Sequence, residues 1–422
     1  MSAVTGIEWT ATVAPDGTVK PGATWNPVTG CRKVSPGCAH CYAEGVAKRF
    51  WATQYRPVLA DGTGRSIDTV STSHHDDLLA NGLARPRQFT DVQCHPERLR
   101  EPLSWRTPRT VFVNSMSDLF EESVPDEFID QVFAVMARCP HLTFIVLTKR
   151  AERMHRYMTL WPDGAGRVHH VRSAVMRSIV GGRDWRDWSS TSPECVVSLA
   201  LTAVWPLPNV RLGVSVENQH FADSRIQVLL ETPAACRLVS LEPLLGFVNL
   251  TWVAQSDDER DGAFDALRGG DWIVKDSSVS LASSHVPMKQ RTYVGVTRPR
   301  LDWVIVGGES GHDARPCDVR WVRAVVQHCQ MAGVPVFVKQ LGSHVRDRND
   351  AGFLGEDERS WPDVIDQEDR IEHDLDGTRD GYQGAPVRIH LKSQKGGDPS
   401  EWPEDLRVRE FPAAVAAPER RG

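Results

Sequence analysis

Three cysteines lie close together near the start of the chain: Cys31, Cys38 and Cys41, with the spacing C-x6-C-x2-C. They stand in a loop rich in glycine and proline, whose turns let three thiolates converge on one centre and free backbone N–H groups to hydrogen-bond the sulfurs. Three protein ligands on a four-iron, four-sulfur (4Fe-4S) cluster leave one iron open to a substrate or cofactor, whereas an electron-transfer cluster takes a fourth cysteine. The loop therefore predicts a cluster with an open iron.

Two other interpretations of this loop stay open. Zinc accepts a set of three cysteines and one histidine, which His40 would complete, although adjacent His40 and Cys41 do not converge easily on a tetrahedral ion. In the other interpretation the thiols bind no metal, which is rare for clustered cysteines in a reduced compartment. A zinc deaminase is excluded, because it carries Pro-Cys-x-x-Cys after an upstream His-x-Glu, and the His-x-Glu of this chain, at 95–97, lies downstream.

The composition is that of a globular protein, with 422 residues, 41% hydrophobic residues and a formal charge of −6. This charge argues against a protein that coats nucleic acid, but not against a local basic groove or a nucleotide-sized substrate. The N-terminus has no basic segment followed by an apolar one, and no run approaches the roughly 18 apolar residues of a membrane span. We therefore expect a cytoplasmic protein without a membrane partner. We expect the other six cysteines to be buried small apolar residues; they are Cys94, Cys139, Cys195, Cys236, Cys317 and Cys329.

Short apolar runs recur along the chain, and each ends in polar residues or glycine. They lie at 111–113, 143–147, 210–214, 237–239, 303–306 and 336–338. Continuous apolar runs indicate strands that are buried on both faces, as in a parallel sheet. Amphipathic helical stretches lie between several of them, at 126–137, 221–230 and 319–332. This alternation predicts an α/β protein built on a parallel, partial β/α barrel, in which functional side chains gather at the carboxyl ends of the strands.

The domain organisation follows from where this alternation holds and where it breaks. We expect the barrel to occupy residues 1–343, with insertions at about 162–208 and 251–300, which show no sustained periodicity. Residues 344–422 begin acidic and rich in glycine, which indicates a C-terminal appendage. Within this appendage, we expect residues 386–411 to fold back as strands.

Several further segments carry a family resemblance. They are IEW (7–9), TWNPVTGC (24–31), SPGCAHCYAE (35–44), FVNSMSDLF (112–120), VLTKR (146–150), LGVSVENQ (212–219), SLEPLLG (240–246), DWVIVGGESG (302–311) and ARP (314–316). In them the chain resembles a phage and prophage family of uncertain function, sometimes called three-Cys-motif phage proteins. A cysteine loop that ends in C-x2-C and follows the first strand of a β/α barrel also resembles the radical S-adenosylmethionine (radical SAM) superfamily. That superfamily usually spaces its cysteines x3 and then x2, so the x6 spacing is a departure.

The resemblance implies a 4Fe-4S cluster on the three cysteines, with S-adenosylmethionine as the cofactor that is cleaved to a 5′-deoxyadenosyl radical. It implies that polar residues at strand ends bind this cofactor, namely Asn114, Ser115, Ser117, Asp118, Ser215, Glu217 and Asn218. The competing interpretation of residues 114–118 is a loop with helix-capping side chains. The candidates for catalysis are two carboxylates and two cations at strand ends, Glu242, Glu309, Lys149 and Lys339.

The sequence therefore favours a radical SAM enzyme that modifies a nucleobase, a nucleotide or a nucleic-acid-linked group. Such an enzyme needs an electron donor, for example flavodoxin or ferredoxin. The alternative is a non-catalytic, zinc-stabilised protein that binds nucleic acid or a protein partner. Carboxylates at four predicted strand ends disfavour this alternative. A protein that binds an anionic ligand such as nucleic acid would not direct carboxylates towards that ligand.

Overall fold

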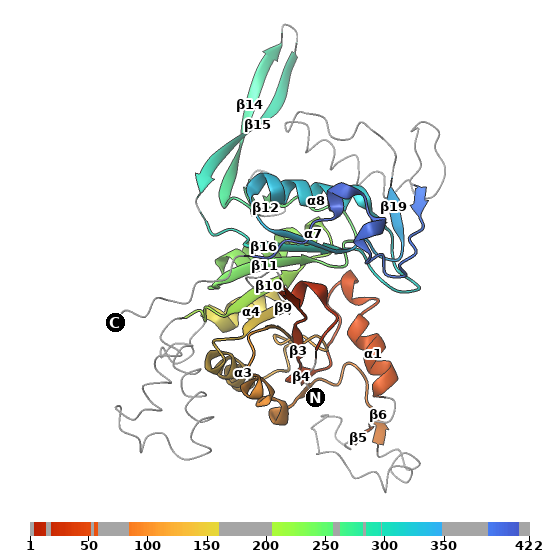
Figure 1. Ribbon diagram of the computed structural model, residues 1–422. Coiled ribbons are helices and arrows are strands. Elements are labelled where there is room, and N and C mark those ends of the chain that lie inside the picture. The colour runs from red at the N-terminus through yellow and green to blue at the C-terminus, as the bar shows by residue number, and fades with distance from the viewer. Residues whose placement is uncertain are drawn as a thin grey trace, which may run out of the picture.

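Seven parallel strands form the main sheet of the protein. The computed structural model describes residues 4–13, 18–51, 55–57, 84–159, 205–255, 262–281, 284–296, 298–347 and 387–412. The strands are β3 (Ala23–Trp25), β8 (Thr110–Val113), β9 (Thr143–Thr148), β10 (Val210–Ser215), β11 (Cys236–Leu241), β16 (Trp303–Gly307) and β18 (Val336–Gln340). Their order in the sheet is their order in the chain, and β3 and β18 form its two ends. The predicted parallel α/β sheet is thus confirmed as a seven-strand half-barrel (Figure 1).

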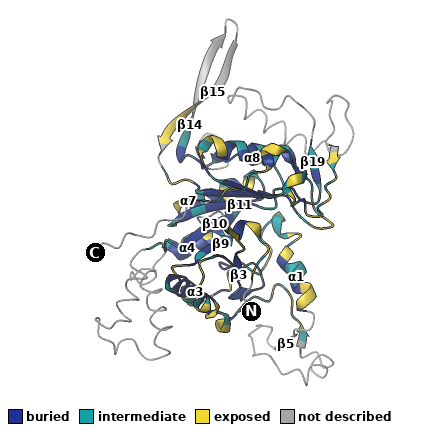
Figure 2. Ribbon diagram, viewed as in Figure 1, coloured by how far each residue is buried: buried dark blue, intermediate teal, exposed yellow. Residues whose placement is uncertain are grey.

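The central strands are buried on both faces, as their continuous apolar sequences predict. All five residues of β16 are buried, and so are five of the six residues of β10. Figure 2 shows this buried sheet in dark blue, with exposed positions on the outer surfaces of the helices that pack on it. The sheet is therefore a rigid platform whose strands all end at the same edge.

Helices connect successive strands of the half-barrel. They are α3 (Asp126–Arg138), α4 (Ala151–Thr159), α7 (Gln219–Glu231) and α8 (Val319–Ala332). The N-cap of α8 is Asp318, whose side chain accepts a hydrogen bond from the backbone N–H of Arg320. Gly333 ends the same helix at φ 65°, the left-handed conformation that glycine adopts without strain. These local signals explain why α8 has the bounds that its sequence pattern predicts.

A small antiparallel sheet lies in the chain between β11 and β16. It consists of β12 (Val253–Ala254), β13 (Ala263–Asp265), β14 (Gly270–Leu281) and β15 (Ser284–Val296). Figure 1 shows β14 and β15 as a long hairpin that extends away from the half-barrel. This sheet occupies most of the insertion expected at 251–300. The other expected insertion, 162–208, lies outside the described residues except for 205–208.

The described C-terminal residues pack against the end of the main sheet. β20 (Val387–Ile389) joins β17 (Cys317–Asp318) and β19 (Val345–Asp347) in a three-stranded sheet. The backbone of residues 408–410 hydrogen-bonds to β18, whose Val338 N–H donates to the Val408 carbonyl at 2.9 Å. Trp402 and Leu406 are fully buried in the main core. This segment covers the edge of β18, which would otherwise leave backbone groups unpaired.

None of the described helices has both the length and the apolar character that crossing a bilayer requires.

Candidate functional site

The three-cysteine loop follows β3 and the short strand β4 (Val28–Thr29). Gly30 turns the chain at φ 90°, where a side chain would be strained. The loop then passes through a 3-10 helix, η2 (Pro36–Cys38), and ends where Cys41 precedes α1 (Tyr42–Phe50). The three thiols are partly exposed, whereas Cys139, Cys236, Cys317 and Cys329 are buried. The expected burial of the scattered cysteines is confirmed for these four and is wrong for Cys94, which is partly exposed; Cys195 lies outside the described residues.

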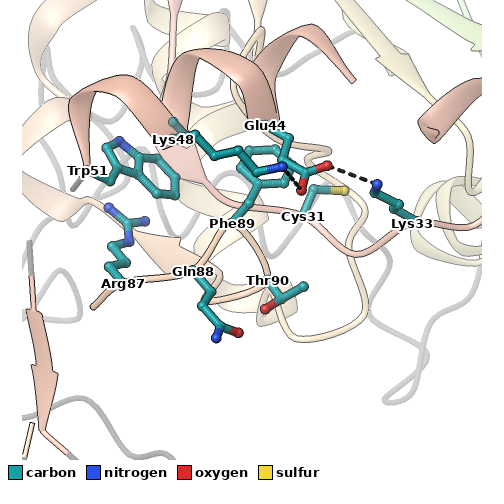
Figure 3. Close-up of a pocket in the computed structure, with 10 residues that line it drawn as sticks. Cys31, Lys33, Glu44, Lys48, Trp51, Arg87, Gln88, Phe89 and Thr90 are labelled. Atoms are coloured by element: carbon teal, nitrogen blue, oxygen red, sulfur yellow. Dashed lines mark ion pairs between the residues drawn. The ribbon is translucent and has the colours of Figure 1, made fainter. Parts of the chain in front are cut away.

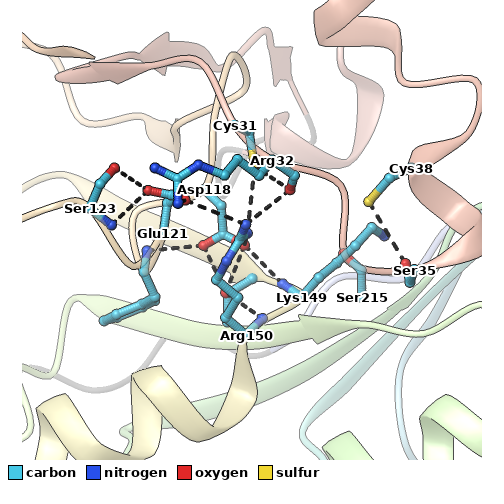
Figure 4. A network of polar contacts seen from close by, with 12 residues as sticks. Cys31, Arg32, Ser35, Cys38, Asp118, Glu121, Ser123, Lys149, Arg150 and Ser215 are labelled. Carbon is cyan, nitrogen blue, oxygen red and sulfur yellow. Dashed lines mark hydrogen bonds and ion pairs between the residues drawn. The ribbon is translucent and has the colours of Figure 1, made fainter. Parts of the chain in front are cut away.

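Cys31 lies against a buried cation from the end of β9 (Figure 4). Nη1 of Arg150 is 3.5 Å from the Cys31 sulfur and 3.1 Å from Oδ2 of Asp118, and Nη2 donates to the Arg32 carbonyl at 2.9 Å. Burial, with a further contribution from the negative charge of Asp118, raises the pKa of the Cys31 thiol to about 12, although Arg150 opposes this shift. Without a metal the thiol is therefore protonated at neutral pH.

Cys38 lies beside a second buried carboxylate, at the end of β10. Ser35 donates to Oε1 of Glu217 at 2.7 Å, and its hydroxyl is 3.8 Å from the Cys38 sulfur. Glu217 is completely buried and is paired with Lys149 at 2.8 Å and with Arg225 at 3.0 Å. A Cβ atom on Gly37 would lie only 2.4 Å from Oε1 of Glu217, so the loop can approach this closely only with glycine there.

Cys41 follows a histidine that contacts a third carboxylate, at the end of β16. Nδ1 of His40 is 3.1 Å from Oε2 of Glu309. Arg315 donates to both oxygens of Glu309, at 2.9 and 2.6 Å, and its Nη1 donates to the Pro36 carbonyl at 3.0 Å. Burial disfavours ionisation of Glu309, but the hydrogen bonds from Arg315 and His40 lower its pKa below the ordinary value. Glu309 is thus an ionised anchor for this part of the loop.

Each part of the cysteine loop is therefore held by a different strand-end carboxylate. We call Asp118, Glu217 and Glu309 the loop anchors; they act through Arg150, Ser35 and His40, respectively. The thiols also influence one another, because a charge on Cys38 raises the pKa of both Cys31 and Cys41.

The donor set fits a metal centre in number and kind, since three partly exposed thiols share one loop. In the described part of the chain, however, no three Cys, His, Asp or Glu side chains are grouped tightly enough to hold a metal ion. A cluster would therefore have to draw the three sulfurs closer together.

The other predicted cofactor residues mostly support the backbone around the loop. Asn114, at φ 63°, accepts a hydrogen bond from the Val28 N–H at 3.3 Å, and Ser117 donates to the Val28 carbonyl at 2.9 Å. Ser115 exchanges hydrogen bonds with the side chain of Asn26. Nδ2 of Asn114 is buried without a hydrogen-bond partner among the described residues. It is therefore a donor that a ligand could satisfy.

Two predicted residues lie at the ends of β10 and α7. Asn218 is the N-cap of α7 and accepts a hydrogen bond from the Phe221 N–H at 3.3 Å. The Ser215 carbonyl accepts a hydrogen bond from Arg225 at 2.6 Å, and Figure 4 shows Ser215 beside Lys149. The helix-capping role of Asn218 is thus observed, while cofactor binding by either residue stays a prediction.

The four catalytic candidates separate into two groups. Lys149 and Glu309 belong to the network around the loop. Glu242 and Lys339, from the ends of β11 and β18, form an ion pair with each other at 3.0 Å. A Cβ atom on Gly307 would lie 3.0 Å from Oε1 of Glu242, so the backbone of β16 passes close to this carboxylate.

Sequence reasoning missed several side chains of the network; they include Ser35, His40 as a partner of Glu309, Glu121, Arg225 and Arg315. A weak signal existed for Arg315, because it lies in the ARP segment that carries the family resemblance. Arg225 gave no signal, because it lies on a helix that was expected only to cover the sheet. Its pairing with Glu217 depends on how α7 packs on β10.

Cys31 also lines a pocket of about 390 Å³ beside α1 (Figure 3). Glu44 lies in this pocket between Lys33 and Lys48, at 3.0 and 3.1 Å. The rings of Trp51 and Phe89 stack with centroids 5.9 Å apart. The guanidinium of Arg87 lies 3.6 Å from the centre of the Trp51 ring. Near Cys31 the pocket is thus lined by the charge pairs of Glu44, while Trp51 and Arg87 lie at its other end (Figure 3).

Comparison with known proteins identifies a family but no activity. Neither a curated protein nor a solved structure matches the chain. A family model described as "Protein of unknown function (DUF5131)" matches residues 4–394. This match contains no link to the radical SAM superfamily or to three-Cys-motif phage proteins, so both resemblances stay predictions. Because the matched region covers nearly the whole sequence, the chain belongs to the DUF5131 family.

Proposed function

We propose that this protein is an iron–sulfur enzyme of the radical SAM type. Cys31, Cys38 and Cys41 would hold a 4Fe-4S cluster, and S-adenosylmethionine would be the cofactor. One observation carries the proposal: three partly exposed thiols share a loop that buried carboxylates tie to the strand ends of a parallel half-barrel. In β/α barrels this edge of the sheet is where active sites are built. The half-barrel is accordingly proposed to be of the radical SAM type.

When bound, a cluster with three protein ligands supplies an electron and an open iron for S-adenosylmethionine. The residues of the chain would hold and orient the reactants. Glu217 is paired with two cations, Lys149 and Arg225, while Asp118 and Glu121 pair with a third, Arg150. Lys149 and Arg225 would suit the cofactor carboxylate or a substrate phosphate, with which they can form charge-assisted hydrogen bonds. Nδ2 of Asn114, which has no hydrogen-bond partner among the described residues, is a further donor that such a ligand could satisfy.

The partners in this proposal follow from the chemistry and from the family resemblance. Reductive cleavage consumes an electron, so a donor such as flavodoxin or ferredoxin is required. The substrate is proposed to be a nucleobase, a nucleotide or a nucleic-acid-linked group. This part rests on the resemblance to phage proteins together with the two cations that pair with Glu217.

A second candidate function is favoured by one contact. A histidine that binds zinc usually gives its other ring nitrogen to a carboxylate, and Nδ1 of His40 lies 3.1 Å from Glu309. In this candidate His40 completes a zinc site with the three cysteines. The protein would then be a non-catalytic, zinc-stabilised binder of nucleic acid or of a protein partner.

Anaerobic reconstitution with iron and sulfide tests the proposal. The protein should take up about four irons per chain and absorb broadly near roughly 400 nm. After reduction with dithionite it should release 5′-deoxyadenosine from S-adenosylmethionine, measured by chromatography, and Cys38→Ala should lose both properties. The matched control is Cys94→Ala, which changes a partly exposed cysteine outside the loop. Stoichiometric zinc without iron would refute the proposal, and a loaded cluster that never cleaves the cofactor would refute its catalytic part.

A further inference from the structure

Arg150 is a buried cation that lies between the cysteine loop and the carboxylates of Asp118 and Glu121. Its side chain is only 8% exposed, and its Nη1 lies between the Cys31 sulfur and Asp118. Nη2 donates to the Arg32 carbonyl and lies 3.9 Å from Glu121, which is itself buried. The guanidinium is therefore held by hydrogen bonds and ion pairs on several sides.

The three thiols differ in the groups that face them. The sulfur of Cys38 faces the neutral hydroxyl of Ser35 at 3.8 Å. Cys41 is the N-cap of α1, where burial raises the pKa of its thiol and the backbone N–H groups of Glu44 and Ala43 oppose this rise. Cys31 instead has a charged donor at 3.5 Å. The three thiols thus differ in hydrogen bonding, with the charged donor at Cys31.

A charged donor beside a cluster ligand affects the oxidised and reduced states unequally. Reduction adds one negative charge, part of which resides on the ligand sulfurs, so a nearby cation and its hydrogen bond stabilise the reduced state more. Solvent screens this effect little, because Arg150 is almost fully buried. At Cys31 the negative charge of Asp118 offsets the positive charge of Arg150, so the directed N–H···S contact carries the expected effect.

We propose that Arg150 is a positioning residue that raises the reduction potential of the cluster through its contact with Cys31, an inference that rests on the proposed function. Arg150 does not bind iron in this proposal, and it does not touch the substrate. Its role is to make the reduced cluster accessible to the electron donor. A merely structural role would change folding or cluster retention and would leave the potential of a retained cluster unchanged.

Redox titration of the reconstituted protein, followed by electron paramagnetic resonance without S-adenosylmethionine, tests this role. Arg150→Gln should keep its iron but lower the ratio of reduced to oxidised cluster about tenfold at a given solution potential. That change corresponds to about 59 mV for a one-electron couple. Arg150→Lys, which keeps the charge, should recover part of the shift. The matched control is Arg156→Gln on α4, the helix that follows Arg150, because Arg156 is about half exposed and pairs with Glu122.

The outcomes separate this inference from the proposed function. If Arg150→Gln retains its cluster with the wild-type potential, the inference is overturned while the proposed function stands. If both Arg150→Gln and Arg150→Lys lose the cluster, Arg150 has a structural role and the inference is also overturned. If the wild-type protein binds zinc and no iron, the proposed function is refuted, and the inference about Arg150 is refuted with it.

Discussion

Replacing Gly37 by alanine would press the cysteine loop against the most deeply buried of the loop anchors. The new Cβ atom would meet Glu217 at 2.4 Å from Oε1, 2.5 Å from Cγ and 2.8 Å from Cδ. Glu217 cannot retreat easily, because Lys149 and Arg225 hold it, and breaking a buried ion pair costs about 3–5 kcal/mol. The loop should therefore move instead and lose the hydrogen bond from Ser35.

Overpacking of this kind costs about 1–3 kcal/mol. A cost of about 2 kcal/mol lowers the population of the native loop conformation by a factor of about 30. Gly37→Ala should therefore unfold at lower denaturant concentration and retain less iron after reconstitution. The matched control is Gly45→Ala in α1, where a Cβ atom meets nothing within 4 Å. Alanine there should be neutral or stabilise the helix by up to about 1 kcal/mol.

A double variant shows whether Glu217 is the obstacle. Shortening it by one methylene in Glu217→Asp should relieve part of the clash, so that Gly37→Ala costs less in the Glu217→Asp background than in the wild type. The two substitutions should therefore be non-additive in the free energy of unfolding. If Gly37→Ala matches Gly45→Ala in both unfolding and iron content, the loop does not rest on Glu217 and the reasoning fails.

Three further predictions test the site and the fold. His40→Ala should keep the iron of the reconstituted protein, because His40 contacts Glu309 and is not a proposed cluster ligand; loss of metal as complete as in Cys38→Ala would favour the zinc candidate. His328 is buried, and burial lowers its pKa from 6.5 to about 4. Its contribution to stability is therefore fully present above pH 6.5 and is lost as the pH falls towards 4, by about 3 kcal/mol in total. Denaturant titrations at several pH values should show that the free energy of unfolding depends less on pH between 4 and 6.5 in His328→Gln than in the wild type. An equal pH dependence in the two proteins would contradict the prediction. Trp402→Ala should lower the free energy of unfolding by about 3–5 kcal/mol, because this ring is 2% exposed and its N–H donates to the Gly396 carbonyl. A loss below about 1 kcal/mol would show that the C-terminal segment does not stabilise the half-barrel.

Local sequence patterns predicted the central strands and helices well. The apolar runs at 143–147 and 210–214 correspond to β9 and β10, with ends that agree to within one residue. The helical pattern at 319–332 coincides with α8. Such elements are predictable because periodic burial and capping residues act over a few neighbouring positions. The antiparallel sheet at 253–296 gave no comparable signal. Its strands are stabilised by packing against their cross-strand neighbours, and the pattern of apolar residues within each segment does not show this packing.

The sequence by itself determined the thiols and the carboxylates of the candidate site. Three thiols within one loop, and carboxylates directly after buried apolar runs, can be recognised from residue types and spacing alone. A sheet whose parallel strands follow one another in chain order then requires these carboxylates to lie along one edge.

Only the tertiary structure decided which groups meet. Ser35 reaches Glu217 across 182 positions of sequence, and His40 reaches Glu309 across 269. These pairings depend on the register of the strands and on how helices α7 and α8 pack, which are set by burial of the whole core. A buried carboxylate must also find partners at the point where it is buried. For Glu217 these partners are Lys149 and Arg225, and the loop that holds the cysteines is positioned on the network they form.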